Sequence, residues 1–464
     1  MHLFRHRCVR HQIAPNHPLA GKVVYIPAMA EGSVEIFASV FRWLGIEAYP
    51  TPPSDARTRE LGNKYTSGDE CYPAKITVGD FLKIIEGRSF DSARAVFLMP
   101  TADGPCRFGQ YVPFISRVLQ DIGYGDVQIL SPHGERGYSD MGEFGVPFVR
   151  ATWRALASAD ILRKLLLQTR PYETVSGSAD LAFQESVRDF CQTLESSCFD
   201  YDCQLKALVA ALVRARSRFR GIAARYDRET PLIGVVGEIF CRLNSFSNDD
   251  LVRRLESFGA ECWMSDITEW IAYTNQEEVR DFRLTGRAFS PGMLRSKLRS
   301  HIQRADMKAL LVPFREDFGG CEEPEIEELI DLATPYLPYP GAEGEMVVSI
   351  GKSAYFAKHG ADGIVDISPF TCMNGIVSEA IYPKLSQDYG GIPIRNFYFD
   401  STQSDLDRDL EIHLELTHSY RQKKRYQRHY PSHFPTGYCV PLHLAEADPN
   451  HNKPGSDKPT RGVR

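Results

Sequence analysis

The chain has 464 residues, more than one hydrophobic core usually organises, so two or more domains are expected. Hydrophobic residues make up 43% and charged residues 25% of the sequence, which is typical of a folded globular protein. The 54 lysines and arginines against 60 aspartates and glutamates give a net charge of −6, which argues against nucleic acid as the main partner.

The compartment follows from what the sequence lacks. No stretch has the roughly 18 consecutive apolar residues of a membrane span, and the basic first residues lack the apolar segment of a secretory signal. We therefore expect a soluble, cytoplasmic protein that does not use a membrane. In the cytoplasm the eleven cysteines are not expected to form structural disulfides, so they must be core residues, metal ligands or reactive thiols.

In chain order, an irregular arm over residues 1–20 is followed by a first α/β lobe over residues 21–142. Buried apolar runs, typical of strands, alternate there with amphipathic runs, typical of helices. The expected elements are strand Lys22–Pro27, helix Ser33–Leu44, strand Glu47–Pro50, helix Ala74–Glu86, strand Ala95–Met99, helix Gln110–Ile122 and strand Val127–Leu130. This alternation predicts a mainly parallel sheet.

A helical connector or cap is expected over residues 143–230, a second α/β lobe over residues 231–420 and a partly disordered tail over residues 421–464. The expected elements of the second lobe are strand Leu232–Gly237, helix Asn248–Phe258, strand Glu261–Met264, helix Glu325–Ala333, helix Ser353–His359, strand Gly363–Ile367, a helix over 375–384 and strand Ile392–Phe399. The predicted fold is thus two Rossmann-like or flavodoxin-like lobes joined by a helical segment. The basic run Arg421–Arg428 is interpreted as a solvated helix end, with anion binding as the alternative.

Three cysteines occupy the same kind of position. Cys71 precedes the helix that starts near Ala74, and Cys106 and Cys372 each lie between a predicted strand and the next helix. Ligands bind in this crevice of a parallel sheet, and a helix N-terminus there lowers a thiol pKa from its free value of about 8.5. The positions therefore favour thiolate ligands of an iron–sulfur cluster between the lobes, although ordinary crevice cysteines would look the same.

Several longer segments resemble one group of proteins: GNKYTSGDECYPAKITVGDFL (Gly62–Leu82), PTADGPCRFGQY (Pro100–Tyr111), RPYE (Arg170–Glu173), VVGEIFCRLNSFSNDDLVRRLESFGAE (Val235–Glu261), EWIAYTN (Glu269–Asn275) and SIGKSAYFAKHGADGIVDISPFTCMNG (Ser349–Gly375). The group is the acyl-CoA dehydratase activase-related proteins, which are similar to the iron–sulfur subunits of 2-hydroxyacyl-CoA dehydratases. The resemblance covers about residues 20–415.

The resemblance implies a [4Fe–4S] cluster held by Cys71, Cys106 and Cys372, with one iron left without a cysteine. It also implies an electron donor, an ATP-dependent activase with an actin-like fold, which drives one electron in at very low potential. The substrate would be a 2-hydroxyacyl-CoA or another small reducible compound, and the reaction that of a radical-type iron–sulfur lyase or reductase. A non-catalytic binding or assembly partner of the activase system is the alternative. Some relatives carry a double cubane, and a homodimer or heterodimer is compatible with the sequence.

The chain departs from the pattern of this family at three places. Asn374-Gly375 stands where Pro-Gly usually follows the third cysteine, Asp400-Ser401 where Asp-Gly usually ends the last strand, and Asp409-Leu410-Glu411 where Arg-Leu-Glu is usual. These changes leave the proposed ligands in place, but they put contacts to a substrate or partner in doubt.

Three further residues adjoin the predicted crevice. Glu238 ends the first strand of the second lobe, and it would either relay protons next to a cluster or cap the backbone groups of Asn244 and Asn248. Arg107 and Gln110 follow a proposed ligand, and they would contact an acyl-thioester or tune the cluster. A structural salt bridge is the alternative for Arg107.

The remaining signals are weaker. The run Ser349–Ser353 (SIGKS) resembles a Walker loop but lacks its first glycine, so we expect no phosphate loop there. Cys191, Cys198 and Cys203 lie close together in the helical middle and are either packing residues or a second metal site. Cys321 is the most credible extra ligand, Cys241 and Cys262 are expected in the core, and Cys8 and Cys439 lie in the expected tails.

Overall fold

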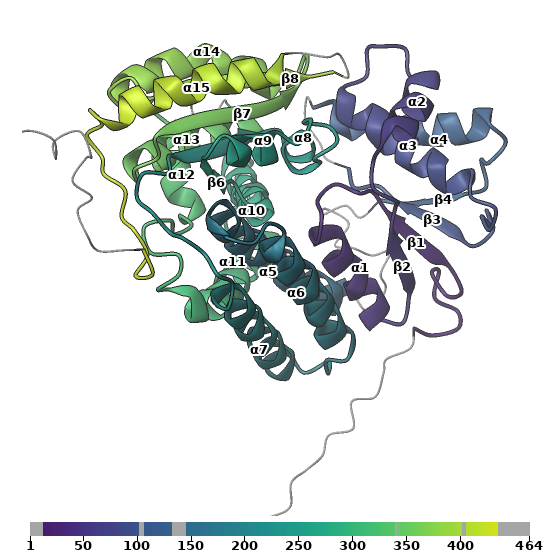
Figure 1. Cartoon of the computed structure of the whole chain (residues 1–464). Helices are drawn as coiled ribbons and strands as arrows, with labels where there is room; N and C mark the ends of the chain where they lie inside the picture. Colours follow the sequence, from purple (N-terminus) through teal and green to yellow (C-terminus); the bar gives the residue numbers. More distant parts are fainter. Residues whose placement is uncertain are drawn as a thin grey trace, which may run out of the picture.

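The computed structural model describes residues 13–101, 106–131, 145–338, 342, 344–400 and 405–434. Figure 1 shows two α/β lobes side by side, with a group of long helices lying along one side of both. Each lobe has a four-stranded parallel sheet, in the order β2-β1-β3-β4 in the first and β6-β5-β7-β8 in the second. The predicted fold class, two parallel-sheet lobes, is confirmed.

The first lobe extends from the first strand to the fourth and carries helices between them. Its elements are β1 (Val23–Ile26), α1 (Ser33–Trp43), β2 (Glu47–Pro50), α2 (Ala56–Lys64), α3 (Tyr72–Ile85), β3 (Ala95–Leu98), the 3₁₀ turn η1 (Arg107–Gln110), α4 (Tyr111–Asp121) and β4 (Gln128–Leu130). The chain places β2 on one side of β1 and β3 on the other, so a switch point lies between β1 and β3. Ligands bind at such a point, beyond the carboxyl ends of the strands.

The second lobe repeats this strand order, with its switch point between β5 and β7. Its elements are β5 (Leu232–Gly237), α8 (Ile239–Leu243), α9 (Leu251–Ser257), β6 (Glu261–Met264), α12 (Ile326–Ala333), α13 (Glu345–Lys358), β7 (Gly363–Pro369), α14 (Met373–Asp388), β8 (Ile394–Phe399) and α15 (Leu406–Arg421). At the end of β5, Gly237 has a φ of 113°, and a Cβ there would lie 2.2 Å from the carbonyl oxygen of Ile367. Only glycine tolerates both conditions, and the resulting turn positions Glu238.

Long helices connect and flank the lobes. They are α5 (Gly145–Thr169), α6 (Ser178–Glu195), α7 (Tyr201–Arg220), α10 (Ile267–Leu284) and α11 (Pro291–Leu311), with the 3₁₀ turns η4 (Arg170–Tyr172) and η5 (Val312–Phe314). None of the helices in the described ranges combines the length and the apolar character that crossing a bilayer requires.

The lobes are in direct contact. Ala30, Tyr72 and Ile76 of the first lobe pack in the same apolar cluster as the buried strands β5 and β7 of the second. The Asn244 amide also donates to the carbonyl oxygen of Ala28, at 2.6 Å, which joins the lobes by a hydrogen bond. A site between the lobes is therefore formed by two surfaces that are already packed together.

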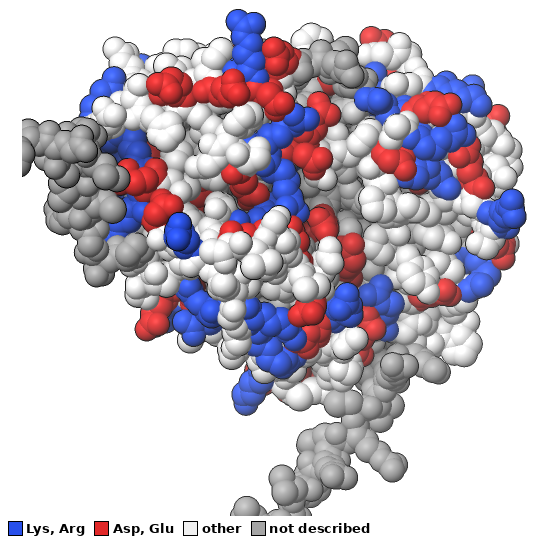
Figure 2. Space-filling model, viewed as in Figure 1, with Lys and Arg blue, Asp and Glu red and all other residues white. Residues whose placement is uncertain are grey.

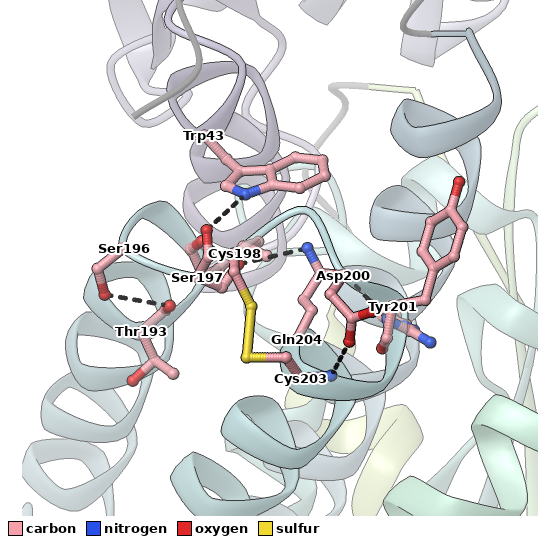
Figure 3. The surroundings of a disulfide bond; sticks show 11 residues. Trp43, Thr193, Ser196, Ser197, Cys198, Asp200, Tyr201, Cys203 and Gln204 are labelled. Atoms are coloured by element: carbon pink, nitrogen blue, oxygen red, sulfur yellow. Dashed lines mark hydrogen bonds between the residues drawn. A yellow bond between two sulfur atoms is a disulfide. The ribbon is translucent and has the colours of Figure 1, made fainter. Parts of the chain in front are cut away.

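The turn between α6 and α7 corrects one prediction. Cys198 and Cys203 form a disulfide with a Cα–Cα distance of 6.5 Å (Figure 3). The expectation that the cysteines are unpaired is wrong for this pair, because the short turn brings together two thiols that are five residues apart. The same turn contacts the first lobe, since the Trp43 indole donates to the carbonyl oxygen of Ser197 at 3.1 Å.

The basic run after α15 also differs from its interpretation. Lys424 and Arg428 are buried, and they pair with Asp362 at 2.6 Å and Glu261 at 2.7 Å. These cations neutralise carboxylates of the second lobe, so the solvated interpretation is wrong for Lys424 and Arg428, whereas Lys423 and Arg425 of the same run are exposed. Elsewhere acidic and basic side chains are interspersed over the face drawn in Figure 2.

Candidate metal centre

Each of the three cysteines is the residue that caps a helix. Cys71 precedes α3, Cys106 precedes η1 and α4, and Cys372 precedes α14. All three have extended backbone conformations, and none of their side chains forms a cap hydrogen bond. These are the positions that the sequence predicted from the strand and helix pattern.

Backbone N–H groups lie near all three sulfurs without forming side-chain cap hydrogen bonds. The group of Ala74 favours the thiolate of Cys71, that of Phe108 the thiolate of Cys106, and those of Gly375 and Asn374 the thiolate of Cys372. Backbone N–H groups beside a ligand sulfur are one means by which proteins tune iron–sulfur clusters.

The thiol pKa values differ from the prediction. Burial raises the pKa of Cys71, Cys106 and Cys372, and the N–H donors offset this only in part. The expected lowering by the helix ends is therefore wrong for the protein alone, because the loss of water around each sulfur outweighs the partial charge of the helix end, even for Cys106, whose residue is exposed overall. A bound metal supplies the positive charge that ligand thiolates need.

The three thiols lie within electrostatic reach of shared groups. The pKa of Cys106 is raised by burial and then by Glu345, Glu238 and Cys71. The pKa of Cys372 is raised by burial and also by Glu238 and Glu345. Two thiols from the first lobe and one from the second thus surround one location, which two carboxyl groups also border.

Arg107 ties the three cysteine loops together. Its Nη1 donates to the carbonyl oxygen of Asp69 at 2.7 Å, and its Nη2 donates to the carbonyl oxygen and the Oγ1 of Thr371, at 2.6 and 2.9 Å. Arg107 itself follows Cys106, while Asp69 and Thr371 adjoin the other two ligands. These bonds to neutral groups replace the salt bridge considered from the sequence, and the guanidinium is engaged in holding the loops. Gln110, the other predicted cofactor contact, is exposed.

Thr371 has a φ of 64°, in the left-handed region that a β-branched residue rarely adopts. Strain of this kind persists only where the surroundings impose it, and it is common at functional sites. The two bonds from Arg107 hold the residue there. The bend presents Cys372 at the start of α14.

Glu238 is half-buried and caps α8. Its carboxylate accepts from the backbone N–H groups of Phe240 at 3.0 Å and Cys241 at 2.7 Å, and burial raises its pKa. The capping alternative therefore fits the structure, but the capped groups are not those of Asn244 and Asn248. The location beside the thiols leaves the proton-relay alternative untested.

Glu345 and Tyr111 border the centre, and the sequence did not single them out. Glu345 begins α13 and accepts from the Ile239 N–H at 2.8 Å; burial, and then Glu238, raise its pKa to about 8. The Tyr111 hydroxyl lies 2.6 Å from the Cys71 sulfur. Tyr111 stands in the GPCRFGQY segment, so the resemblance could have marked it, whereas no motif marked Glu345.

Among the described residues, no three His, Cys, Asp or Glu side chains lie close enough to bind one metal ion. Cysteine thiolates are the usual ligands of iron–sulfur clusters, in which each cysteine binds a different iron. The donor type of the three residues therefore suits a cluster.

The other free cysteines of the described chain are buried. Cys241 and Cys262 are fully buried, as predicted, and Cys191 packs in the core of the first lobe. Cys241 also lies within electrostatic reach of Glu238, Cys372 and Cys71, which raise its pKa further. Cys321 is buried in the second lobe, where burial raises its pKa and the charged groups that influence it are Arg428, Glu261, Lys164 and Glu323. Cys8 and Cys439 lie outside the described residues.

Comparison with models of known protein families gives no match, and comparison with curated proteins gives none either. The assignment of this centre therefore rests on the residues and their geometry.

Replacing Glu345 by glutamine is expected to flatten the dependence of stability on pH. The folded-state pKa of about 8 lies above the ordinary value of 4.5, so the carboxyl contributes stability that is present below pH 4.5 and lost as the pH rises towards 8. The full shift corresponds to roughly 5 kcal/mol at most, and the expected effect is smaller because the group is only half-buried. Urea unfolding of the metal-free protein at pH 5.5 and 8.5 measures the effect. Glu415→Gln, on the exposed face of α15, is the control, and an unchanged pH dependence in Glu345→Gln would contradict the assignment.

Proposed function

We propose that the chain is an iron–sulfur protein whose Cys71, Cys106 and Cys372 hold a [4Fe–4S] cluster between the two lobes. The protein would accept a low-potential electron from an ATP-dependent activase and use it on a small reducible substrate such as a 2-hydroxyacyl-CoA. The proposal is supported by three cysteines that each precede a helix or 3₁₀ turn, lie within electrostatic reach of shared carboxyl groups, and stand on loops that Arg107 joins.

When bound, the cluster supplies one-electron chemistry at low potential, and three thiolates leave one iron open to an oxygen ligand. The chain's own residues shape the surroundings of that iron. Glu238 and Glu345 border the thiols, and the raised pKa of Glu345 lets it hold a proton at neutral pH. A proton held there is available to a hydroxyl group that leaves a substrate.

A separate protein as the source of ATP-driven electrons is consistent with the SIGKS segment. Ser349–Ser353 lies within α13, and Lys352 is fully buried between Glu269 and Glu323. A phosphate loop needs a free lysine and exposed backbone N–H groups at a helix start. This segment offers neither, which supports assigning ATP hydrolysis to the partner.

The test is the iron and acid-labile sulfide content after strictly anaerobic purification, with an EPR spectrum of the dithionite-reduced protein. We expect roughly four irons and four sulfides per chain. Twice that content would indicate a double cubane and would require ligands beyond the three cysteines. A chain that stays iron-free after anaerobic reconstitution would refute the proposal and would favour a binding or assembly partner of the activase system.

A further inference from the structure

One proposed ligand has a side-chain hydrogen-bond partner in the described chain. The Cys71 sulfur lies 2.6 Å from the hydroxyl of Tyr111. Nearby backbone N–H groups favour the thiolates of all three cysteines, but no side chain hydrogen-bonds to the sulfur of Cys106 or Cys372 among the described residues. Tyr111 is therefore the side chain placed to act on a proposed ligand.

The phenol is fixed in place by its surroundings. Tyr111 is 6% exposed and is the first residue of α4, and its ring packs edge-on against Phe108 with the centroids 5.3 Å apart. Its hydroxyl points to the Cys71 sulfur at 2.6 Å. In the thiol form either atom could donate, but a metal-bound thiolate carries no proton, so the phenol then becomes the donor.

We infer that Tyr111 tunes the reduction potential of the centre through a hydrogen bond from its hydroxyl to the Cys71 sulfur. This inference rests on the proposed function, because it requires a cluster on Cys71. A donor to a ligand sulfur withdraws negative charge, and it stabilises the reduced cluster, which carries the extra electron, more than the oxidised one. Tyr111 acts through Cys71 and is therefore a positioning residue rather than a catalytic one.

The hydrogen bond also distinguishes Cys71 from the other two proposed ligands, because it comes from a side chain that a single substitution can remove. A cluster held by the three cysteines would therefore respond to the loss of this hydroxyl at one ligand.

The experiment compares the iron-loaded full chain with Tyr111→Phe and with Tyr72→Phe. Tyr72 is another buried tyrosine next to Cys71, and the structure records no hydrogen bond from its hydroxyl to a described cysteine. Iron and sulfide are measured first, and then the midpoint potential is measured by EPR-monitored titration. We expect full iron content in both variants, a more negative potential in Tyr111→Phe only, and loss of one exchangeable proton coupling in its reduced EPR spectrum.

The outcomes separate the inference from the function on which it rests. An iron-loaded Tyr111→Phe with unchanged potential and couplings would overturn the inference and leave the cluster in place. Loss of iron from Tyr111→Phe alone would show that the phenol holds the cluster rather than tunes it, and would also overturn the inference. A wild-type chain without iron would overturn both.

Discussion

Replacement of Cys106 by alanine is expected to give a folded chain that binds no stable iron–sulfur cluster. The side chain is exposed, so its truncation removes little packing and changes the free energy of unfolding by less than about 0.5 kcal/mol. Its loss removes one of three protein ligands and leaves one more iron without an anchor. Iron and sulfide per chain after anaerobic reconstitution should fall from roughly four to near zero, while the thermal unfolding of the metal-free proteins should coincide.

A matched control is Cys321→Ala. Cys321 is also a free cysteine, but it is buried in the core of the second lobe, and Lys164 donates to its backbone oxygen rather than to its sulfur. This variant should keep its iron and lose some stability, the opposite of Cys106→Ala. If Cys106→Ala bound as much iron as the wild type, the proposed ligand set would be wrong; if Cys321→Ala lost its iron, a fourth ligand would be needed.

Replacement of Lys352 by methionine is expected to destabilise the second lobe by about 3–5 kcal/mol, because it leaves a buried charge without its partner. The Lys352 side chain is fully buried and pairs with Glu269 at 2.7 Å and with Glu323. Glu323 keeps a second cation, Lys164, but Glu269 loses its ion-pair partner. Urea unfolding monitored by circular dichroism measures the loss.

Two comparisons make this result specific. The double variant Lys352→Met/Glu269→Gln removes the unpaired charge and should recover part of the lost stability. Lys384→Met breaks an exposed i,i+4 pair with Asp388 and should cost less than about 1 kcal/mol. A Lys352→Met protein as stable as the wild type would contradict the buried ion pair, and would reopen the phosphate-loop interpretation of the SIGKS segment.

The strands were the most predictable part of the fold. Glu47–Pro50, Leu232–Gly237 and Glu261–Met264 were predicted with the bounds that the structure has, because short runs bounded by turn residues are too short for a helix and are typical of strands. Helix α13 begins at Glu345, eight residues before the predicted start at Ser353. Its residues Met346–Ala357 are all buried, so the sequence has no polar face from which a 3.6-residue period can be recognised.

Helices α10 and α11 were not predicted at all. Together with α2 and α15 they lie in segments that carry many charged residues, where the apolar positions give a weak periodic signal. Their ends are marked locally, as by the Ser290 side chain that accepts from the Met293 N–H at 3.2 Å before Pro291. Such a cap identifies where a helix starts but not how far it extends.

The sequence predicted which cysteines form the candidate site. It did not predict the residues that hold the cysteine loops in place. A cysteine directly before a helix can be recognised from the local sequence pattern of a single lobe. All three proposed ligands occupy this kind of position. The bond from Arg107 to Thr371 joins residues 264 positions apart, and no local pattern contains it. The raised thiol pKa values were missed for a related reason, since the depth of burial depends on how the two lobes pack.

Arg107 and Thr371 are synthesised at different times, because they are 264 positions apart in the chain. Chains are synthesised from the N-terminus at about 5–20 residues per second, so the 264 residues between Arg107 and Thr371 take roughly 13–50 s to emerge. During this interval Cys71 and Cys106 are already present on the ribosome-bound first lobe. Neither Cys372 nor the hydrogen bond from Arg107 to Thr371 has yet formed beside them. During that time the two thiols of the first lobe are without the contact from Arg107 to Thr371, so they are more open to oxidants and to foreign metals than in the folded chain.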